Sequence, residues 1–593
     1  MKSPAPCLVR HSGVAKPQRP PLPGLLLVGL LAVPGVLVAA TPSIQIDGLN
    51  ATQLQNARAF LGLSGLKCDT AQWRLQSALD KAPQEITQGL QALGHYRPKI
   101  SGGQLKREAG CWSVNYRVDP GTPVKLAEVD VQIQGEASDD RRFARLLRDL
   151  PLKPGQVLNH GAYEDLKTQL LSLASQRGYF EARFSDHRLL IKPSSGQAWV
   201  HLRLQSGSRY RFGQISYQQE GLNEALLRRY EDFEPDEPFS TNKLNRFQQA
   251  LMASNYFDNV MVKPQQDRAS KRVNLEVELT GRKQLAYGIG LGFSTDEGPR
   301  ASFDFEKRYV NKRGHRFRTS GKLSAIGGNL ISSYAIPLDD PTQEWLTFSG
   351  QFEQEETDSS DRYTFSLGAK MTSDLGNNWL QTLALDLMHE EYEVGSLKDH
   401  ATPLVPSISW EQTRRKGRNL IREGHQFKLK LAAAPVDFSN GSRFVQAKGS
   451  AFWIGTPWEN GRILARAQLG ATWAEDAERL SVSHRFFAGG DRSIRGYDFE
   501  SLGPKNPSGE VIGGTYLAVA SLEYEHRVLT DWAVAAFVDS GNAYDDDLND
   551  IYTGVGLGLR WFSPIGPIKL DLAHPLDDPD NDFRLHLSIG PEF

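Results

Sequence analysis

One arginine in a glycine-rich stretch and two acidic residues downstream of it have the types and spacing to bind one another. Arg495 precedes Gly496 in the stretch from Phe487 to Tyr497. Glu523 and Asp539 lie in the next two segments of alternating apolar and polar residues, each on the polar face of its segment. Guanidinium groups bind carboxylates through charge-assisted hydrogen bonds. We therefore expect Arg495 to fold inward and lock its loop to Glu523 and Asp539, whereas an exposed loop charge is the alternative.

Sequence patterns for catalysis and cofactor binding are missing. The chain has no G-x-S-x-G, P-loop or H-E-x-x-H motif and no Cys/His cluster with metal-ligand spacing. The glycines at 288–292 and 554–558 alternate with large apolar residues, so they line a strand face rather than a dinucleotide loop. The acidic runs 545–547 and 577–582 are interpreted as solvated loop charge, with calcium binding as the alternative. We expect no enzyme activity, catalytic residue, metal or cofactor.

The composition of the chain excludes two classes of protein. Its 593 residues are enough for several domains. Lys and Arg number 68 against 70 Asp and Glu, so the chain lacks the basic surface of a nucleic-acid-binding protein. The mean hydropathy is -0.43 and no long apolar run follows residue 40, which excludes a protein that crosses the membrane with helices.

Residues 1–40 have the features of a secretory signal peptide. Basic residues without an acidic one precede an apolar run from Leu25 to Val38, and Val38-Ala39-Ala40 fits a cleavage site. Pro34 interrupts the run, so a transmembrane anchor is the weaker interpretation. The sequence therefore predicts export.

Export leaves two cysteines in the mature chain. Cys7 is removed with the signal peptide, and Cys68 and Cys111 remain in an oxidising compartment. A disulfide between them is expected, with two buried free thiols as the alternative.

The residues between the signal peptide and about position 281 contain a weak internal repeat. Gly94-His95-Tyr96, Gly178-Tyr179-Phe180 and Asn255-Tyr256-Phe257 each end a helical pattern, and two short strands follow each of them. Each unit is predicted to be strand, two helices, strand, strand. A small sheet with a free edge can add an extended peptide, although solvated or blocked edges fit equally well. The predicted α+β modules span 41–121, 122–207 and 208–281.

Residues 282–593 are predicted to form an all-β transmembrane barrel. They consist of segments with period-2 alternation separated by turn residues, and about 16 such segments of ~19 residues each fit this length. A soluble sandwich would show the same alternation. The final segment favours the barrel, because its apolar residues alternate with polar ones and it ends on Phe593, as bacterial outer-membrane proteins do. With the modules in the periplasm, the long connection at 474–513 becomes the sixth outward loop.

The first and last barrel strands are predicted to close a weak seam. The first strand has glycines along one face, and the last contains a glycine and a proline that weaken strand pairing. We expect Gly290 to lie near Ser588 across this seam. Opening it would expose edge strands that can template an incoming strand, whereas Pro591 simply ending the strand is the alternative. The seam residues are Gly288, Gly290, Gly292, Gly590 and Pro591.

Several motifs resemble those of the BamA/TamA superfamily of outer-membrane assembly and secretion proteins. Ile494-Arg495-Gly496-Tyr497 resembles the loop-six motif of that superfamily. The segments 520–524, 537–542 and 563–567 resemble the strand motifs that follow it, and the modules look like POTRA domains. Three modules before the barrel resemble the TamA type, the outer-membrane subunit of the translocation and assembly module.

The resemblance implies both a location and a function. It implies a barrel in the outer membrane of a Gram-negative bacterium, with POTRA-like modules in the periplasm. It implies a factor that assists insertion or translocation of autotransporters and other β-barrel proteins through a lateral seam. The implied partners are an inner-membrane-anchored TamB-type protein, unfolded outer-membrane protein substrates and outer-membrane lipid. A two-partner-type secretion transporter, which would pass one substrate through the lumen, is the alternative.

Overall fold

The computed structural model describes residues 41–590 except 109, 418–419, 440, 549, 565 and 579–582. The predicted signal peptide, Pro591 and Phe593 lie outside the described residues. None of the described helices has the length and apolar character needed to cross a membrane. The chain forms two compact units, and the boundary between them passes through the second module. The first unit is Met1–Val131, Leu150–Lys167 and Asp186–Leu202, and the second is Gln132–Asp149, Thr168–Ser185 and Arg203–Phe593.

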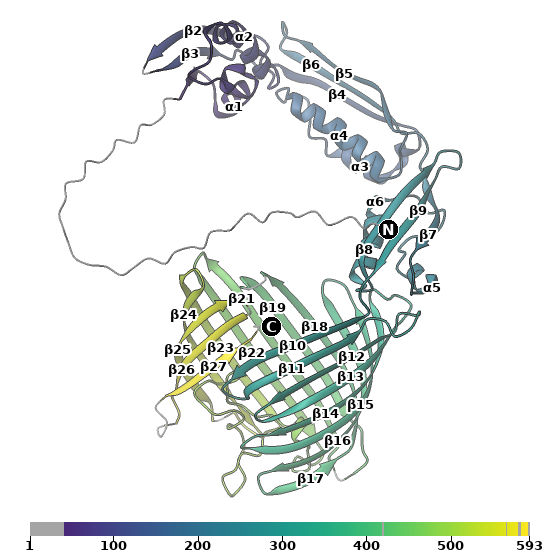
Figure 1. Cartoon of the computed structure of the whole chain (residues 1–593), viewed down its shortest axis with the longest axis vertical. Coiled ribbons are helices and arrows are strands. Elements are labelled where there is room, and N and C mark those ends of the chain that lie inside the picture. The colour runs from purple at the N-terminus through teal and green to yellow at the C-terminus, as the bar shows by residue number, and fades with distance from the viewer. Residues whose placement is uncertain are drawn as a thin grey trace, which may run out of the picture. The chain divides into compact units, whose positions relative to one another are not determined.

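Three small α+β modules have the predicted element order (Figure 1). Each sheet has three strands with the last one in the centre, in the orders β1-β3-β2, β4-β6-β5 and β7-β9-β8. The first module contains β1 (Ser43–Asp47), α1 (Ala51–Phe60), η1 (Gly62–Gly65), α2 (Gln72–Gln91), β2 (Lys99–Glu108) and β3 (Cys111–Asp119). The second contains β4 (Lys125–Gln134), η2 (Glu136–Asp139), α3 (Arg141–Arg148), α4 (His160–Gln176), β5 (Arg183–Lys192) and β6 (Gln197–Gln205). The third contains β7 (Arg211–Gln218), α5 (Glu224–Arg228), α6 (Thr241–Ala253), β8 (Phe257–Asp267) and β9 (Arg272–Gly281).

The core of the first module follows from two residue periods. Helix α2 buries residues three or four apart, which form one apolar stripe. Strand β3 buries every second residue over most of its length. The stripe and the strand face form one cluster, so each element covers the apolar face of the other. The principal residues are Leu75, Leu79, Ile86 and Leu90 of α2 and Trp112, Val114, Tyr116 and Val118 of β3.

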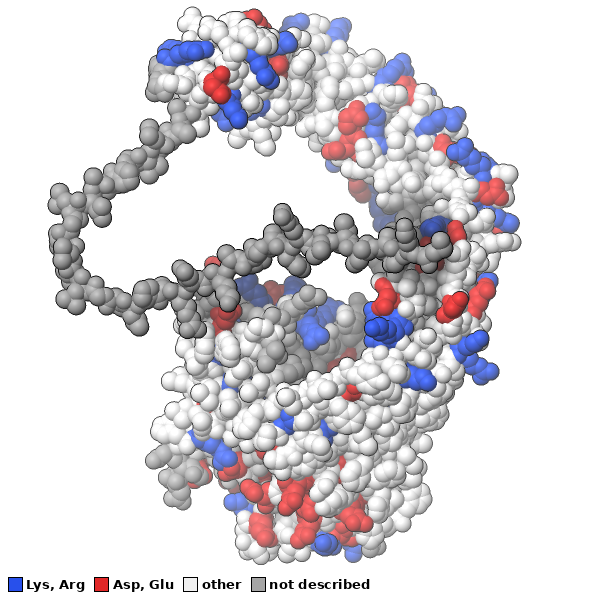
Figure 2. Space-filling model, viewed as in Figure 1, with Lys and Arg blue, Asp and Glu red and all other residues white. Residues whose placement is uncertain are grey.

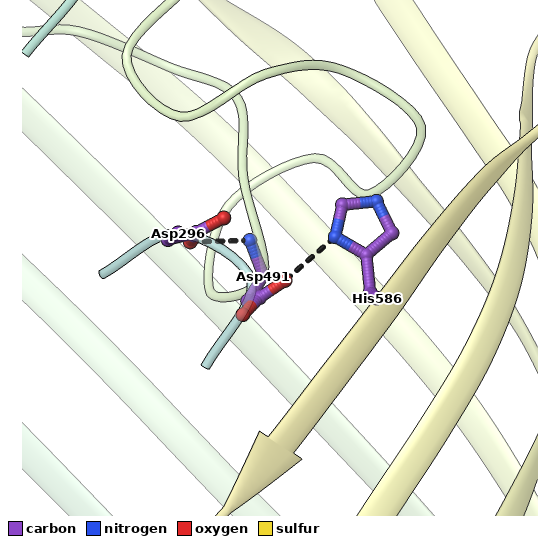
Figure 3. A group of neighbouring side chains, drawn as sticks. All are labelled: Asp296, Asp491 and His586. Carbon is purple, nitrogen blue, oxygen red and sulfur yellow. Dashed lines mark hydrogen bonds and ion pairs between the residues drawn. The ribbon is translucent and has the colours of Figure 1, made fainter. Parts of the chain in front are cut away.

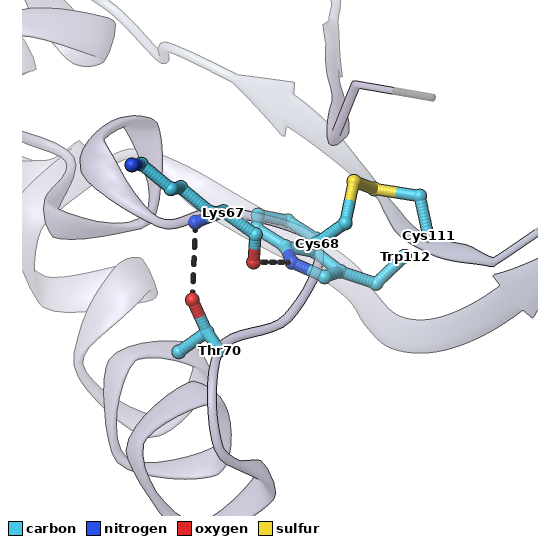
Figure 4. The surroundings of a disulfide bond; sticks show 5 residues. All are labelled: Lys67, Cys68, Thr70, Cys111 and Trp112. Carbon is cyan, nitrogen blue, oxygen red and sulfur yellow. Dashed lines mark hydrogen bonds between the residues drawn. A yellow bond between two sulfur atoms is a disulfide. The ribbon is translucent and has the colours of Figure 1, made fainter. Parts of the chain in front are cut away.

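A disulfide joins Cys68 to Cys111, at the start of β3 (Figure 4). The bonded residues are 43 positions apart, and their Cα atoms are 4.5 Å apart. The indole of the neighbouring Trp112 donates a hydrogen bond to the carbonyl of Lys67 at 3.0 Å, which holds the same two segments together. The loop that precedes α2 is therefore tied to the central strand of the sheet.

Replacing both cysteines with serine should lower the unfolding free energy of the first module by about 2–4 kcal/mol, because the disulfide restricts the unfolded chain. Chemical denaturation of the mature protein with and without reductant measures the difference. Mass spectrometry of unreduced protein should find the peptides of Cys68 and Cys111 linked. Two thiols that alkylate without reduction would contradict the pairing.

The barrel is closed and has the predicted 16 strands. β16 pairs directly with β18, and β19 pairs directly with β21, so the short β17 and β20 are extensions beside the barrel wall. The first half comprises β10 (Leu285–Ser294), β11 (Gly298–Lys307), β12 (Arg316–Ser324), β13 (Gly327–Pro337), β14 (Glu344–Glu356), β15 (Ser360–Asp374), β16 (Trp379–Val394), β17 (Leu397–Ala401) and β18 (Pro403–Lys416). The second half comprises β19 (Glu423–Ala434), β20 (Val436–Asp437), β21 (Phe444–Trp458), β22 (Gly461–Ala474), β23 (Tyr516–Leu529), β24 (Trp532–Tyr544), β25 (Tyr552–Ser563), β26 (Gly566–Pro575) and β27 (Arg584–Ile589).

The outer face of the barrel is apolar, as the period-2 pattern predicts. On β10, the alternate residues Tyr287, Ile289 and Leu291 are 73%, 87% and 84% exposed. On β23, Leu522 is exposed while its neighbours Ser521 and Glu523 are buried inside. The visible wall of the barrel carries few charged groups, and acidic side chains gather at the end where β16 and β17 lie (Figure 2). This wall is suited to contact with lipid.

Candidate functional site: the loop lock and the barrel seam

The connection between β22 and β23, called loop six below, places Arg495 inside the barrel. The side chain is nearly fully buried, at 4% exposed. It donates to both carboxylate oxygens of Asp539, from Nε at 2.7 Å and from Nη2 at 3.0 Å. Nη1 donates to Glu523 at 2.8 Å, and the guanidinium carbon lies 3.4 Å from the ring centre of Phe537. The structure thus brings together the three residues assigned to the loop lock from sequence.

The lock is larger than the sequence analysis predicts. Asp571 of β26 is a third acceptor for Arg495, at 3.1 Å from Nη1. Arg560 of β25, fully buried, donates to Glu523 at 2.7 Å and to Asp571 at 2.5 Å. Further along, Arg462 of β22 pairs with Glu525 at 2.7 Å. Three arginines and four carboxylates thus share one buried network, in which each charge is compensated by neighbours.

Glycines on the inner face of β25 make room for this network. A Cβ on Gly554 would lie 1.8 Å from the carbonyl oxygen of Arg495, and one on Gly558 would lie 1.9 Å from the carboxylate of Asp571. The glycines that alternate along 554–558 therefore leave this face of β25 without side chains. Loop six packs over Gly554, and the carboxylate of Asp571 packs over Gly558. Arg560 and Asp571 are not among the lock residues that the sequence analysis assigned, because only the strand register brings them to Arg495.

The other residues of the loop-six motif position the loop. Ile494 is fully buried in a small apolar cluster with Phe486 and Val519. Gly496 has φ +102°, a conformation that favours glycine. The hydroxyl of Tyr497 accepts a hydrogen bond from the backbone of Asp577 at 3.3 Å. These contacts hold the backbone on both sides of Arg495.

The seam between β10 and β27 has a short ladder. Among the described residues, these strands pair at Phe293–Ile589 and Ser294–Ser588, followed by a hydrogen bond from Thr295 N to Leu587 O at 3.0 Å. On its other side, β10 pairs with β11 along its whole length. A partner for Gly290 near Ser588, chosen without knowledge of the register, does not match the structure, because Ser588 pairs with Ser294. Register depends on which hydrogen bonds form, and alternation alone does not fix it.

Glycines at the seam accommodate an arginine as well as weakening the strands. Arg300 of β11 reaches across β10 and donates from Nη2 to the carbonyl of Ile589 at 3.1 Å. A Cβ on Gly292 would lie 2.6 Å from Nε of this side chain, and one on Gly590 would lie 2.9 Å from Nη2. A Cβ on Gly290 would likewise lie 2.5 Å from Oγ of Ser302, whereas one on Gly288 would only make an ordinary contact with Asp304. Pro591 and Phe593, assigned to the seam and to the C-terminal signal, lie outside the described residues.

Loop six also contacts both sides of the seam (Figure 3). The backbone N–H of Asp491 donates to Asp296, in the β10–β11 turn, at 2.7 Å. Its carboxylate Oδ1 lies 2.6 Å from Nδ1 of His586 on β27. Gly496 N–H donates to Nε2 of His586 at 2.9 Å, which leaves the ring proton on Nδ1, facing Asp491. Oxygen and nitrogen atoms of Asp296, Asp491 and His586 lie within 4.8 Å of one another, but the ring proton fills the position a metal ion would need.

The turn residue Asp296 makes the seam sensitive to pH. Burial, together with the nearby negative charge of Asp491, raises the pKa of Asp296 from 3.8 to about 7. The protonated form of Asp296 favours the closed seam, because its pKa is higher in the closed state than in the open state. This stabilisation is complete below pH 3.8 and is lost as pH rises to about 7. Closure of the seam should therefore weaken as Asp296 ionises next to Asp491.

Spin labels on Leu291→Cys and Leu585→Cys, both lipid-facing, should report this weakening. The distance distribution between the labels should broaden as pH rises from about 4 to about 7. Asp296→Asn should remove the pH dependence, since an amide does not ionise in this range. A distribution that changes equally with pH in Asp296→Asn would exclude Asp296 as the cause.

The lock and the seam open into one cavity inside the barrel. Its volume is about 650 Å³, and its lining includes Arg495, Asp571, Asp296 and Ser588. The lining carries both signs of charge, with Lys428, Arg466 and Arg492 among the cations. A polar space of this kind suits an extended chain or water and does not resemble a closed apolar pocket for a small ligand.

Comparison with known families agrees with this architecture. The Omp85 superfamily domain matches residues 310–593. The family described as POTRA domain TamA domain 1 matches residues 43–120, and the POTRA family described as a surface antigen variable number repeat matches 129–194 and 210–281. The matches thus cover both the modules and most of the barrel.

Curated relatives and a solved structure carry BamA names. The outer membrane protein assembly factor BamA of Nitratidesulfovibrio vulgaris is 23% identical over 392 residues, which cover 60% of this chain and 48% of that protein. BamA of Neorickettsia risticii is 19% identical over 456 residues, covering 73% of this chain and 61% of that protein. The chain thus spans about half to three fifths of the length of these relatives.

The solved structure of Haemophilus ducreyi BamA lacking POTRA domains 1–3 has the same fold. It matches with a TM-score of 0.66 at 16% identity, covering 78% of this chain and 99% of that one. Residues 310–593 thus match the Omp85 superfamily domain and the modules before them match POTRA families, with the barrel in the outer membrane and the modules in the periplasm.

Proposed function

We propose that this protein assists the insertion and translocation of β-barrel proteins, autotransporters among them, by opening the seam between β10 and β27. The observation that carries the proposal is the ladder of that seam, which among the residues described up to 590 is short compared with the full-length pairing of β10 with β11. The curated relatives are named as assembly factors for outer-membrane proteins, which agrees with it.

The proposed mechanism is strand templating and needs no catalytic residue. Parting β10 from β27 leaves unpaired N–H and C=O groups on both strands, and such edges pair with an extended chain. An unfolded substrate would add its strands there while its apolar side chains enter lipid directly. Lipid is thus the second partner, since each new hairpin must replace lipid at the opening.

The periplasmic modules are proposed to deliver the substrate. Each module has edge strands, β2, β5 and β8 among them, that can add an extended peptide. The TamA-type match of the first module supports the TamA type and, with it, a TamB-type partner anchored in the inner membrane. Co-purification of the periplasmic part of a TamB-type protein with the full mature chain tests that partnership.

Reconstitution tests the proposed function. The mature protein is placed in liposomes, and a urea-denatured autotransporter barrel is added. Folding of the substrate, followed by protease resistance and by heat-modifiable migration, should be faster than in liposomes that hold an unrelated outer-membrane barrel. Equal rates would contradict the proposal. A substrate that instead accumulates as soluble protein inside the liposomes would favour the secretion transporter.

A further inference from the structure

We propose that Asp491 is a latch through which loop six holds the two terminal strands of the barrel together. This inference rests on the proposed function in one respect: the latch would control the opening of the seam. Asp491 binds the first strand hairpin through Asp296 and the last strand through His586. It therefore bridges the two strands beside the pairs Phe293–Ile589 and Ser294–Ser588 of the described seam.

Burial strengthens the hydrogen bonds of these groups. The side chains of Asp491 and His586 are 10% and 3% exposed, so water competes poorly for their hydrogen bonds. Hydrogen bonds to a charged group in a site of low dielectric constant are stronger than those between neutral groups in water. Among the described residues these strands share two backbone pairs, so such bonds add substantially to the contacts that keep this part of the seam closed.

The nearby cations are already engaged by other groups. Arg495 is bound to Asp539, Glu523 and Asp571, and Arg300 is bound to Glu297 and to the carbonyl of Ile589. Arg584 of β27 pairs with Asp498 of loop six. The second oxygen of Asp491, Oδ2, is buried without a hydrogen-bond partner among the described residues. Among the described residues the carboxylate is thus held by His586 alone, so loss of this one contact frees it.

Loop six is shaped for this contact. The carboxylate of Asp296 would lie 2.6 Å from a Cβ on Gly490, the residue before Asp491, so a larger residue would push the loop away. Arg495 follows Asp491 by four positions. The turn between these two residues is closed by a hydrogen bond from Ser493 N to Gly490 O at 3.1 Å. One short segment therefore joins the lock on β23, β24 and β26 to the latch on β10 and β27.

The latch is tested with spin labels at Leu291→Cys and Leu585→Cys in the full mature protein, reconstituted in lipid. Asp491→Ala should broaden the distance distribution towards longer values. Asp491→Asn should keep the narrow distribution, because its amide oxygen can still accept the proton of His586. Lys505→Ala is the matched control, since this cation of the same loop is exposed and is not among the described residues that line the cavity.

A second variant separates the latch from a folding defect. Asp296→Ala removes the acceptor on the first hairpin and leaves the contact with His586 intact, so it should broaden the distribution as well. Heat-modifiable migration shows whether each variant is folded. Unchanged distances in folded Asp491→Ala and Asp296→Ala would overturn the latch. Broadened distances in a protein whose wild type does not accelerate substrate folding would keep the latch and reject the proposed function.

Discussion

A disulfide between Ser294→Cys and Ser588→Cys should form readily and stop assembly of substrate proteins. The two serines are opposite one another across the seam and share the inner face. Thr295 and Leu587, the next pair, are joined by a backbone hydrogen bond, so Ser294 and Ser588 occupy a non-hydrogen-bonded pair. The Cα atoms of such pairs are about 4.5 Å apart, within the range of disulfides. Substrate folding in liposomes should fall to the rate without the protein and recover on reduction.

The control crosslink lies elsewhere in the barrel wall. Ser333 and Ser349 are directly paired between β13 and β14, so Ser333→Cys with Ser349→Cys offers the same chemistry away from the seam. Crosslinked control protein should stay active. Wild-type protein is carried through the same oxidation and reduction, because reductant also reaches the Cys68–Cys111 disulfide. Full activity of protein crosslinked at Ser294 and Ser588 would reject lateral opening and favour a route through the lumen.

Arg495→Ala should release loop six while the barrel remains folded. The change leaves Asp539 without a cation and takes one partner each from Glu523 and Asp571. Removing one member of a buried ion pair costs about 3–5 kcal/mol, because the remaining charge is buried without compensation. Limited proteolysis should then cut residues 475–515 faster, and substrate folding should slow markedly. Lys505→Ala, at an exposed cation of the same loop, should change neither.

Two further variants separate the effect of the buried charge from the attachment of loop six to the barrel wall. Arg495→Lys keeps the charge but loses the paired hydrogen bonds to Asp539, so it should lie between wild type and Arg495→Ala. Asp539→Asn in the Arg495→Ala background removes the uncompensated charge, so barrel stability should recover while loop six stays sensitive to protease. Wild-type protease resistance and activity in Arg495→Ala would show that the lock has no part in function.

Local patterns predicted much of this architecture because they record which face of each element is apolar. Alternation along 282–593, together with a final segment that ends on Phe593, predicted a barrel of about 16 strands, and the three repeats predicted three modules. Parity alone placed Glu523 and Asp539 on the inner face, where an inward loop carrying Arg495 would meet them. These inferences need only the residue period and the preference of guanidinium groups for carboxylates.

Only the tertiary structure decided which residues meet across strands. Arg560 and Asp571 join the lock because the registers of β23 to β26 bring them beside Glu523, and alternation leaves register open. The same freedom explains why Ser588 pairs with Ser294 rather than lying near Gly290. Asp296, Asp491 and His586 are widely separated in the sequence, and barrel closure together with an inward loop brings them into contact. The sequence determined the faces of the strands, whereas closure of the barrel determined the lock, the seam and the latch.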